Sequence, residues 1–256
     1  MNELALFAGA GGGLLAASQL GWRTRCAVEI DPYARKCLLA RQRDGVLEPF
    51  PIWDDIRTFK GDHWRGSIDI ISGGFPCQDI SSAGRGGGIE GKQSGLWKHM
   101  ARIVGEVRPD FVWVENSPLL VVRGLGTVIG DLSSLGYDCR WGIVGAHHAG
   151  ANHFRDRIWI LAYSNGAQCK GGKLSGRAES KNTNSGFSRW WEAEPNVVRV
   201  VDGMAARLDK SGTNFIRGDS KVETVVPNRA KRLKAIGNGQ VPAAMMIAWK
   251  TLTQDL

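Results

Sequence analysis

The sequence predicts an α/β fold in which a mostly parallel sheet is covered by helices on both faces. Three observations support this prediction. Short apolar runs alternate with amphipathic stretches over the first 163 residues, which is typical of repeated strand and helix pairs. Polar, glycine-containing motifs follow several of these runs. The composition, 43% hydrophobic and 23% charged over 256 residues, is sufficient for a sizeable core.

Six short apolar runs have the character of buried strands, and five stretches have helical spacing. The predicted strands are residues 3–7, 25–30, 68–72, 111–115, 137–146 and 157–163. The predicted helices are residues 13–20, 32–43, 96–107, 125–135 and about 242–252. Asp31 and Pro32 are suited to cap the second helix and to occupy its first turn. Ligands of such sheets bind at the carboxyl ends of the strands, so we expect the functional residues there.

A basic segment follows the last predicted strand. Residues 163–235 hold 14 Lys and Arg against 7 Asp and Glu, a net charge of +7, whereas the other 183 residues carry only +1 of the total of +8. Residues 164–189 are rich in Gly, Ser, Asn and Lys, which is the composition of a linker. The segment is either a solvated appendage or, with its Trp-Trp pair at 190–191 and Phe215, a nucleic-acid-binding surface.

The cysteines and the hydropathy pattern indicate a cytoplasmic protein. Five cysteines without a CxxC pair fit a reducing compartment. We interpret Cys26, Cys37 and Cys139 as inert small apolar side chains. The longest uncharged run, residues 4–22, is interrupted by five glycines and has no basic residue before it. We therefore expect neither a membrane anchor nor a signal peptide.

A glycine-rich turn follows the first predicted strand. Residues 7–13 (Phe-Ala-Gly-Ala-Gly-Gly-Gly) lead into the first helix, where glycines allow a ligand to approach backbone amides closely. Glu29 ends the second strand, 18 residues after Gly11, and its carboxylate can accept hydrogen bonds from ribose hydroxyls. A nucleoside cofactor is implied, although Leu14 stands where a dinucleotide fingerprint has its third glycine. The alternative is a tight turn without a ligand.

Cys77 lies in a loop at the carboxyl end of another predicted strand. Residues 74–78 (Gly-Phe-Pro-Cys-Gln) place the thiol outside any apolar stripe, where amides and cations can stabilise a nucleophilic thiolate. The glycine-rich stretch at 84–95 is long enough to close over a substrate as a lid.

Charged side chains occur at the ends of two later strands. Glu115 ends an apolar strand, where partial desolvation raises a carboxyl pKa and suits it to proton donation; capping the next helix is the alternative. His153, Arg155 and Arg157 alternate, which predicts that they share one face of an extended segment and hold a phosphate or a base oxygen. A metal on His147, His148 and His153 is disfavoured, because no convincing carboxylate or thiolate partner accompanies them.

In this order the motifs resemble those of the DNA cytosine-C5 methyltransferase family, particularly the short forms common in phages. The match covers about residues 4–162 and 232–250. Ser117, His153 and Trp97 replace the usual Val, Gln and Phe, and none of these changes removes a catalytic group. The matching segments are residues 6–12, 29–30, 55–56, 74–78, 95–97, 115–116, 153–157 and 237–242.

The resemblance implies the Rossmann-like fold of S-adenosylmethionine-dependent methyltransferases with a small irregular target-recognition region. The catalytic domain would be residues 1–162 and 232–256, and the basic target-recognition region with its linker residues 163–231. The implied partners are double-stranded DNA and a cognate restriction endonuclease, and we expect a monomer without a membrane partner or a metal ion. The residues implied to bind the cofactor S-adenosylmethionine are Phe7, Ala8, Gly9, Gly11, Gly12, Glu29, Ile30, Asp55, Ile56, Pro76, Leu96, Asn238, Gly239 and Gln240.

The resemblance also implies the reaction, with Cys77, Glu115, Arg155 and Arg157 as catalytic residues. The Cys77 thiolate would add to C6 of a flipped-out cytosine while Glu115 protonates or hydrogen-bonds N3, so that C5 takes the methyl group. The two arginines would hold the base and its phosphate. One alternative is a tRNA cytosine-C5 methyltransferase, against which the absence of a Cys-Phe-Thr tripeptide argues. The other is a non-catalytic nucleic-acid-binding protein that keeps the fold, against which the intact catalytic residues argue.

Overall fold

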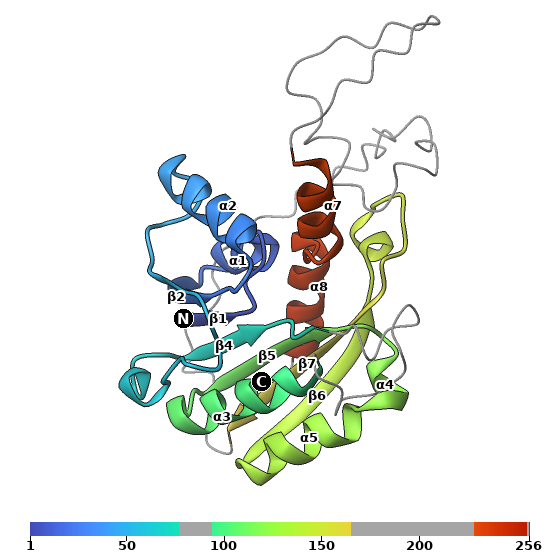
Figure 1. The fold of residues 1–256 in the computed structure, drawn as a ribbon. Coiled ribbons are helices and arrows are strands. Elements are labelled where there is room, and N and C mark those ends of the chain that lie inside the picture. The colour runs from blue at the N-terminus through green and yellow to red at the C-terminus, as the bar shows by residue number, and fades with distance from the viewer. Residues whose placement is uncertain (77–93, 165–227, 255) are drawn as a thin grey trace, which may run out of the picture.

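One sheet runs through the centre of the molecule (Figure 1). The computed structural model describes residues 1–76, 94–164, 228–254 and 256, and within these ranges the sheet has seven strands. The strands are β1 (Asn2–Leu6), β2 (Arg23–Val28), β3 (Ile52–Trp53), β4 (Ile70–Gly73), β5 (Phe111–Asn116), β6 (Tyr137–Val144) and β7 (Arg157–Ser164). Their order across the sheet is β3-β2-β1-β4-β5-β7-β6.

The strand directions decide where the functional motifs lie. Strands β1 to β5 pair in parallel, whereas β7 runs antiparallel to both β5 and β6. The carboxyl ends of the parallel strands therefore meet at one edge of the sheet, and β7 begins at that same edge. As predicted, the sheet is mostly parallel, and its motif-bearing loops converge.

Helices cover both faces of the sheet (Figure 1). On one face, α3 and α5 pack against Ile71, Val112 and Ile160, and on the other, α1 and α8 pack against alternate residues such as Ile70 and Trp113. Helix α2 closes the second face over β1 and β2. The helices of the described ranges are α1 (Gly12–Gln19), α2 (Pro32–Arg43), α3 (Trp97–Val107), α4 (Leu120–Arg123), α5 (Leu125–Ser134), α7 (Arg229–Gly237) and α8 (Pro242–Leu252), and the short 3-10 turns are η1 (Asp62–Trp64), η3 (Ser94–Leu96) and η4 (Ala146–Ala149).

All six predicted strands and all five predicted helices are present, with ends that differ by at most two residues from those expected. The Asp31 side chain accepts hydrogen bonds from the amides of Tyr33 and Ala34, which confirms the predicted cap of α2. Sequence analysis missed β3, α4 and α7. No helix of the described ranges is long and apolar enough to cross a membrane. The Trp-Trp pair, Phe215 and nearly all of the predicted linker lie outside the described residues.

Candidate active site

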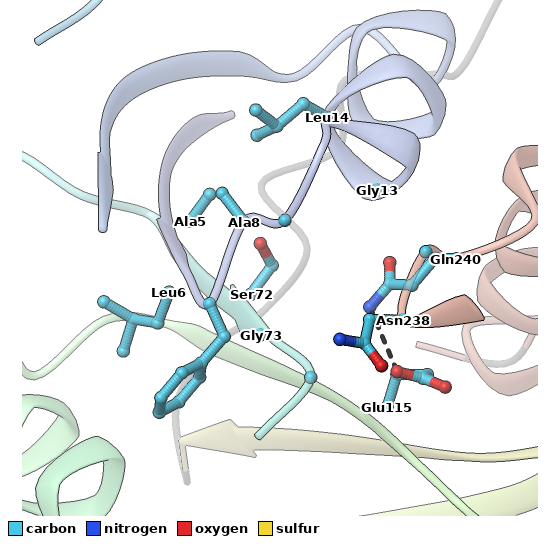
Figure 2. A pocket seen from close by; sticks show the side chains of 14 residues that line it. Ala5, Leu6, Ala8, Gly13, Leu14, Ser72, Gly73, Glu115, Asn238 and Gln240 are labelled. Atoms are coloured by element: carbon cyan, nitrogen blue, oxygen red, sulfur yellow. Dashed lines mark hydrogen bonds between the residues drawn. The ribbon is translucent and has the colours of Figure 1, made fainter. Parts of the chain in front are cut away.

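Motifs that are far apart in the sequence line one cavity at the carboxyl edge of the sheet (Figure 2). They come from the ends of β1, β4 and β5, from the start of α1 and from the turn between α7 and α8. About 420 Å³ of space, part of it open to solvent, lies between the lining residues. Its lining residues are Ala5, Leu6, Phe7, Ala8, Gly9, Gly13, Leu14, Ser72, Gly73, Gly74, Glu115, Asn238, Gly239 and Gln240.

Left-handed backbone conformations shape the turn between β1 and α1. The φ angles of Phe7, Gly9 and Gly11 are 55°, 56° and 95°. A Cβ atom on Gly11 would lie only 2.9 Å from Cδ2 of Leu38, so this position needs glycine for both conformation and space. Phe7 adopts a positive φ without being glycine, a conformation that is uncommon and clusters at functional sites.

Glu29 joins this turn to the end of β2. Its Oε2 atom accepts a hydrogen bond from the amide of Gly9 and its Oε1 atom one from the amide of Asp31, both at 2.7 Å. An ionised carboxylate has about four acceptor positions, so capacity remains for the hydroxyls of a ligand. The neighbouring Ile30 is 59% exposed and offers an apolar surface to a flat ligand.

Glu115, at the end of β5, lies in the wall of the same cavity and is only 8% exposed. Its Oε1 atom forms an ion pair of 2.8 Å with Nε of Arg157. The antiparallel register explains this contact, because Glu115 faces Trp159 on β7 and Arg157 lies two residues earlier on the same face.

Burial is the main influence on the protonation of Glu115. It raises the pKa of this carboxyl, against the opposing charges of Arg157 and Arg155 and a hydrogen bond from Gln240. The direction is the one predicted for a proton donor. The alternative of a helix cap is wrong, since α4 begins after Leu119 and has no side-chain cap.

Asn116 fixes the loop that follows β4. Its Nδ2 atom donates a hydrogen bond of 3.1 Å to the carbonyl oxygen of Phe75, and its Oδ1 atom accepts one of 2.8 Å from the amide of Ser117. Phe75 precedes the predicted nucleophile Cys77 by two residues, and Cys77 itself lies outside the described residues. Sequence analysis noted Asn116 only as part of a motif and missed this contact.

Arg155 corrects one prediction. Its φ is 39° and β7 begins only at Arg157, so His153, Arg155 and Arg157 do not share one face of an extended segment. The Nη2 atom of Arg155 instead donates hydrogen bonds to the carbonyl oxygens of Gly237, at 2.8 Å, and Gly239, at 2.5 Å. Alternation of basic residues is therefore not evidence of a strand when one residue of the series turns the backbone.

The structure brings together about half of the predicted cofactor residues. Gly11 caps α1 and Gly12 begins it, directly beside the cavity but outside its lining. Asp55 pairs with Arg57, whose hydrogen bonds lower the pKa of this carboxyl to about 2, and Ile56 is buried in the core. The half-buried Pro76 and Leu96 also lie outside the lining, as do Glu29 and Ile30, although Glu29 is hydrogen-bonded to the lining residue Gly9. The predicted residues in the lining are Phe7, Ala8, Gly9, Glu115, Asn238, Gly239 and Gln240.

Seven lining residues were not predicted as site residues, although three of them, Leu6, Gly13 and Gly74, lie within the recognised motifs. The clearest signal is the pair Gly73 and Gly74, of which the first ends the buried strand β4 and the second follows it. A Cβ atom on Gly73 would lie 2.9 Å from the carbonyl oxygen of Leu6, and one on Gly74 would lie 2.5 Å from Oε2 of Glu115. Glycine at position 74 leaves the room that the Glu115 side chain occupies, and glycine at position 73 allows β4 to lie close to Leu6.

The cysteines of the described ranges are poor nucleophiles. Burial raises the pKa of Cys26 and of Cys139 to about 11, and it also raises that of Cys37. These thiols are therefore protonated at neutral pH, in agreement with their interpretation as small apolar side chains.

The fold and the cavity define the class of protein. The structure of the Schizosaccharomyces pombe Dnmt2 methyltransferase is similar, with a TM-score of 0.51, 20% sequence identity, and coverage of 64% of this chain and 50% of that one. A prophage-encoded protein of Escherichia coli, described as a DNA modification methyltransferase, has a TM-score of 0.52 and 26% identity, over 64% of this chain and 47% of that one. The architecture is an α/β methyltransferase fold.

Sequence comparison identifies the family within this class. The model of the C-5 cytosine-specific DNA methylase family matches residues 1–239, and the chain belongs to this family. Type II methyltransferase M.CviJI of Paramecium bursaria Chlorella virus IL3A is 35% identical over 163 residues, which are 63% of this chain and 42% of the relative. Type II methyltransferase M2.BsuMI of Bacillus subtilis is 34% identical over 170 residues, with the same coverage. The chain thus spans less than half the length of these relatives.

Proposed function

We propose that this protein transfers a methyl group from S-adenosylmethionine to C5 of cytosine within a specific sequence of double-stranded DNA. The observation that carries the proposal is the position of Glu115. This buried carboxyl, whose pKa is raised, lies in the wall of the cavity that the glycine turn of residues 7–13 forms. A proton donor and a cofactor-type cavity at one strand edge fit a reaction between a bound cofactor and a base.

The residues around the cavity fit S-adenosylmethionine. The free acceptor positions of Glu29 suit ribose hydroxyls, the exposed Ile30 suits the adenine ring, and the turn at Gly9 allows close approach to backbone amides. When bound, this cofactor supplies an electrophilic methyl group. Asp55, Ile56, Pro76 and Leu96 remain proposed contacts from the family resemblance alone.

The chain's own residues would supply the rest of the chemistry. Cys77, as a thiolate, forms a bond to C6 of cytosine, and this displaces the electrons of the C5–C6 double bond towards N3. Glu115 stabilises the negative charge that develops at N3 by giving it a proton or a hydrogen bond. C5 thereby becomes nucleophilic and takes the methyl group. Loss of the C5 proton and departure of Cys77 then restore the aromatic ring. Arg157, already paired with Glu115, and Arg155 would hold the base and its phosphate.

The DNA must present its cytosine outside the helix, because a stacked base cannot reach a cavity at the edge of a sheet. We assign the contacts with the DNA phosphates and with the target sequence to the basic residues 163–231, and the chemistry to residues 1–162 and 232–256. The protein would act as a monomer, and the Type II relatives make a cognate restriction endonuclease a reasonable partner.

Bisulfite sequencing of DNA from cells that express the protein tests this proposal. We expect protected cytosines at one recurring sequence in cells with the wild-type protein and none in cells with Cys77→Ala. Absence of protection in DNA, together with methylated cytosine in tRNA from the same cells, would overturn the assignment to DNA. Absence of both would favour a binding protein that keeps the fold.

A further inference from the structure

Gln240 reaches from the turn before α8 to the predicted proton donor. Its Nε2 atom lies 3.5 Å from Oε2 of Glu115 and donates a hydrogen bond to it, which the dashed line in Figure 2 marks. The other carboxylate oxygen, Oε1, is paired with Arg157. The two oxygens of Glu115 thus have different partners, one cationic and one neutral.

Three glycines leave the space in which Gln240 lies, one beside its backbone and two beside its side chain. A Cβ atom on Gly13 would collide with Oε1 of Gln240, and one on Gly12 would collide with its backbone carbonyl oxygen. A Cβ atom on Gly74 would lie 3.2 Å from Nε2 of Gln240 and closer still to Glu115. Helix α1 and the end of β4 therefore confine the amide group against the carboxylate.

The backbone that carries Gln240 is itself held in place. Arg155 donates two hydrogen bonds to the carbonyl oxygens of Gly237 and Gly239, so the turn is tied to the segment that precedes β7. Arg157, two residues further along, holds the opposite oxygen of Glu115. Gln240, Glu115 and the two arginines, together with the turn that carries Gln240, therefore form one continuous hydrogen-bond network.

We propose that Gln240 is a positioning residue that orients Glu115 and sets the balance between its protonated and ionised forms. The proposal rests on the proposed function in taking Glu115 as the proton donor, and it adds a role for Gln240 that is separate from contact with a cofactor. Arg157 and Arg155, the charged side chains that face Glu115 from the described elements, favour only the carboxylate. An amide can serve both forms, since it donates N–H to a carboxylate and accepts O–H from a carboxylic acid.

The first test is a titration of Glu115 by carbon-13 NMR of its side-chain carboxyl, assigned with Glu115→Gln, in the wild type and in Gln240→Met. Methionine keeps the length of the side chain but cannot donate a hydrogen bond, so the pKa of Glu115 should rise. Gln240→Glu should raise it further, because it adds a second negative charge. The exposed Gln254→Met is the matched control and should leave the titration unchanged.

Gly13→Ala tests the same contact without changing Gln240. Its new methyl group must displace the glutamine amide, because the far end of a flexible side chain moves more easily than a backbone. The titration of Glu115 should therefore shift in the same direction as in Gln240→Met, and the double variant should shift no further than either single one. Gly130→Ala, on the exposed side of α5 with no neighbour within 4 Å, is the matched control.

The pH profile of methyl transfer gives the functional readout. For Gln240→Met we expect kcat/KM at the optimal pH to fall about tenfold. We also expect the alkaline limb of the pH profile, which is set by loss of the Glu115 proton, to move to higher pH. A fall in kcat/KM without any shift of the limb or of the NMR titration would overturn the proposal and leave Gln240 a packing residue. Because the titration needs no catalysis, an inactive wild type would refute the proposed function alone.

Discussion

Three buried glutamates illustrate how neighbours decide the chemistry of the same side chain. Glu3, on β1, accepts hydrogen bonds from the hydroxyls of Ser72 and Thr24, at 2.6 and 2.7 Å. Glu29 accepts two backbone amides, and Glu115 pairs with an arginine. Burial, partly offset by these two hydrogen bonds, raises the pKa of Glu3 to about 7, so this group titrates near neutral pH.

The raised pKa of Glu3 predicts a pH dependence of stability. The folded protein holds the Glu3 proton up to about pH 7, whereas an unfolded chain releases it near the ordinary value of 4.5. The folded state therefore binds more protons between these values, and the free energy of unfolding should decrease as pH rises through that window, by on the order of 3 kcal/mol. Urea unfolding of Glu3→Gln should lack this decrease. Glu48→Gln, at an exposed site, should retain it.

Glu29 gives a prediction about cofactor affinity. Glu29→Ala removes the acceptor that holds Gly9 and that we assign to the ribose, so S-adenosylmethionine should bind more weakly by about 1.5–3 kcal/mol. Isothermal titration calorimetry measures the change, with Glu48→Ala as the exposed control. An unchanged dissociation constant would mean that Glu29 only shapes the turn.

The functional role of a single residue could be predicted from the sequence where a motif marks that residue. It could not be predicted where the role depends on a contact that only the fold creates. Glu29 and Glu115 could be identified because each ends an apolar strand. The contact of Gln240 with Glu115 joins residues 125 positions apart and has no local signal. The same holds for the left-handed backbone of Arg155, since nothing in its neighbours requires a positive φ.

At the scale of elements, Asp31 links two helices. Its Oδ1 atom caps α2, and its Oδ2 atom forms an ion pair of 2.8 Å with Nζ of Lys234 on α7. Asp31→Ala removes both contacts and should lower the free energy of unfolding by about 1 kcal/mol or slightly more. Asp31→Asn keeps a good cap and loses only the partly exposed ion pair, so urea unfolding should show a smaller loss. Equal losses would contradict a role for the cap.

The elements that sequence analysis missed are those without a hydrophobic pattern of sufficient length. Strand β3 has two residues and α4 a single turn, both too short for a periodicity. Helix α7 is strongly basic and buries only Ile236, so it lacks an apolar face. The antiparallel direction of β7 also has no local signal, yet it brings Arg157 to Glu115.

At the scale of the whole molecule, charge and chemistry are separated along the chain. Nearly all of the net positive charge belongs to residues 163–235, whereas the cavity, the glycine turn and Glu115 belong to the nearly neutral remainder. This division is what the proposed function requires, because phosphate binding and methyl transfer need different surroundings. The convergence of the strand ends that line the cavity could be predicted from the alternation of strands and helices, whereas the contacts within the cavity could not.

We propose that cytosine C5 is methylated through a covalent bond between C6 and Cys77. The measurement that tests it most directly uses DNA in which 5-fluorocytosine replaces the target cytosine. Fluorine at C5 cannot leave as a proton does, so the bond to Cys77 persists. With S-adenosylmethionine, the wild type should form a complex that survives denaturing electrophoresis, and Cys77→Ala should form none. A Cys77→Ala protein that still methylates cytosine would show that Cys77 is not the nucleophile.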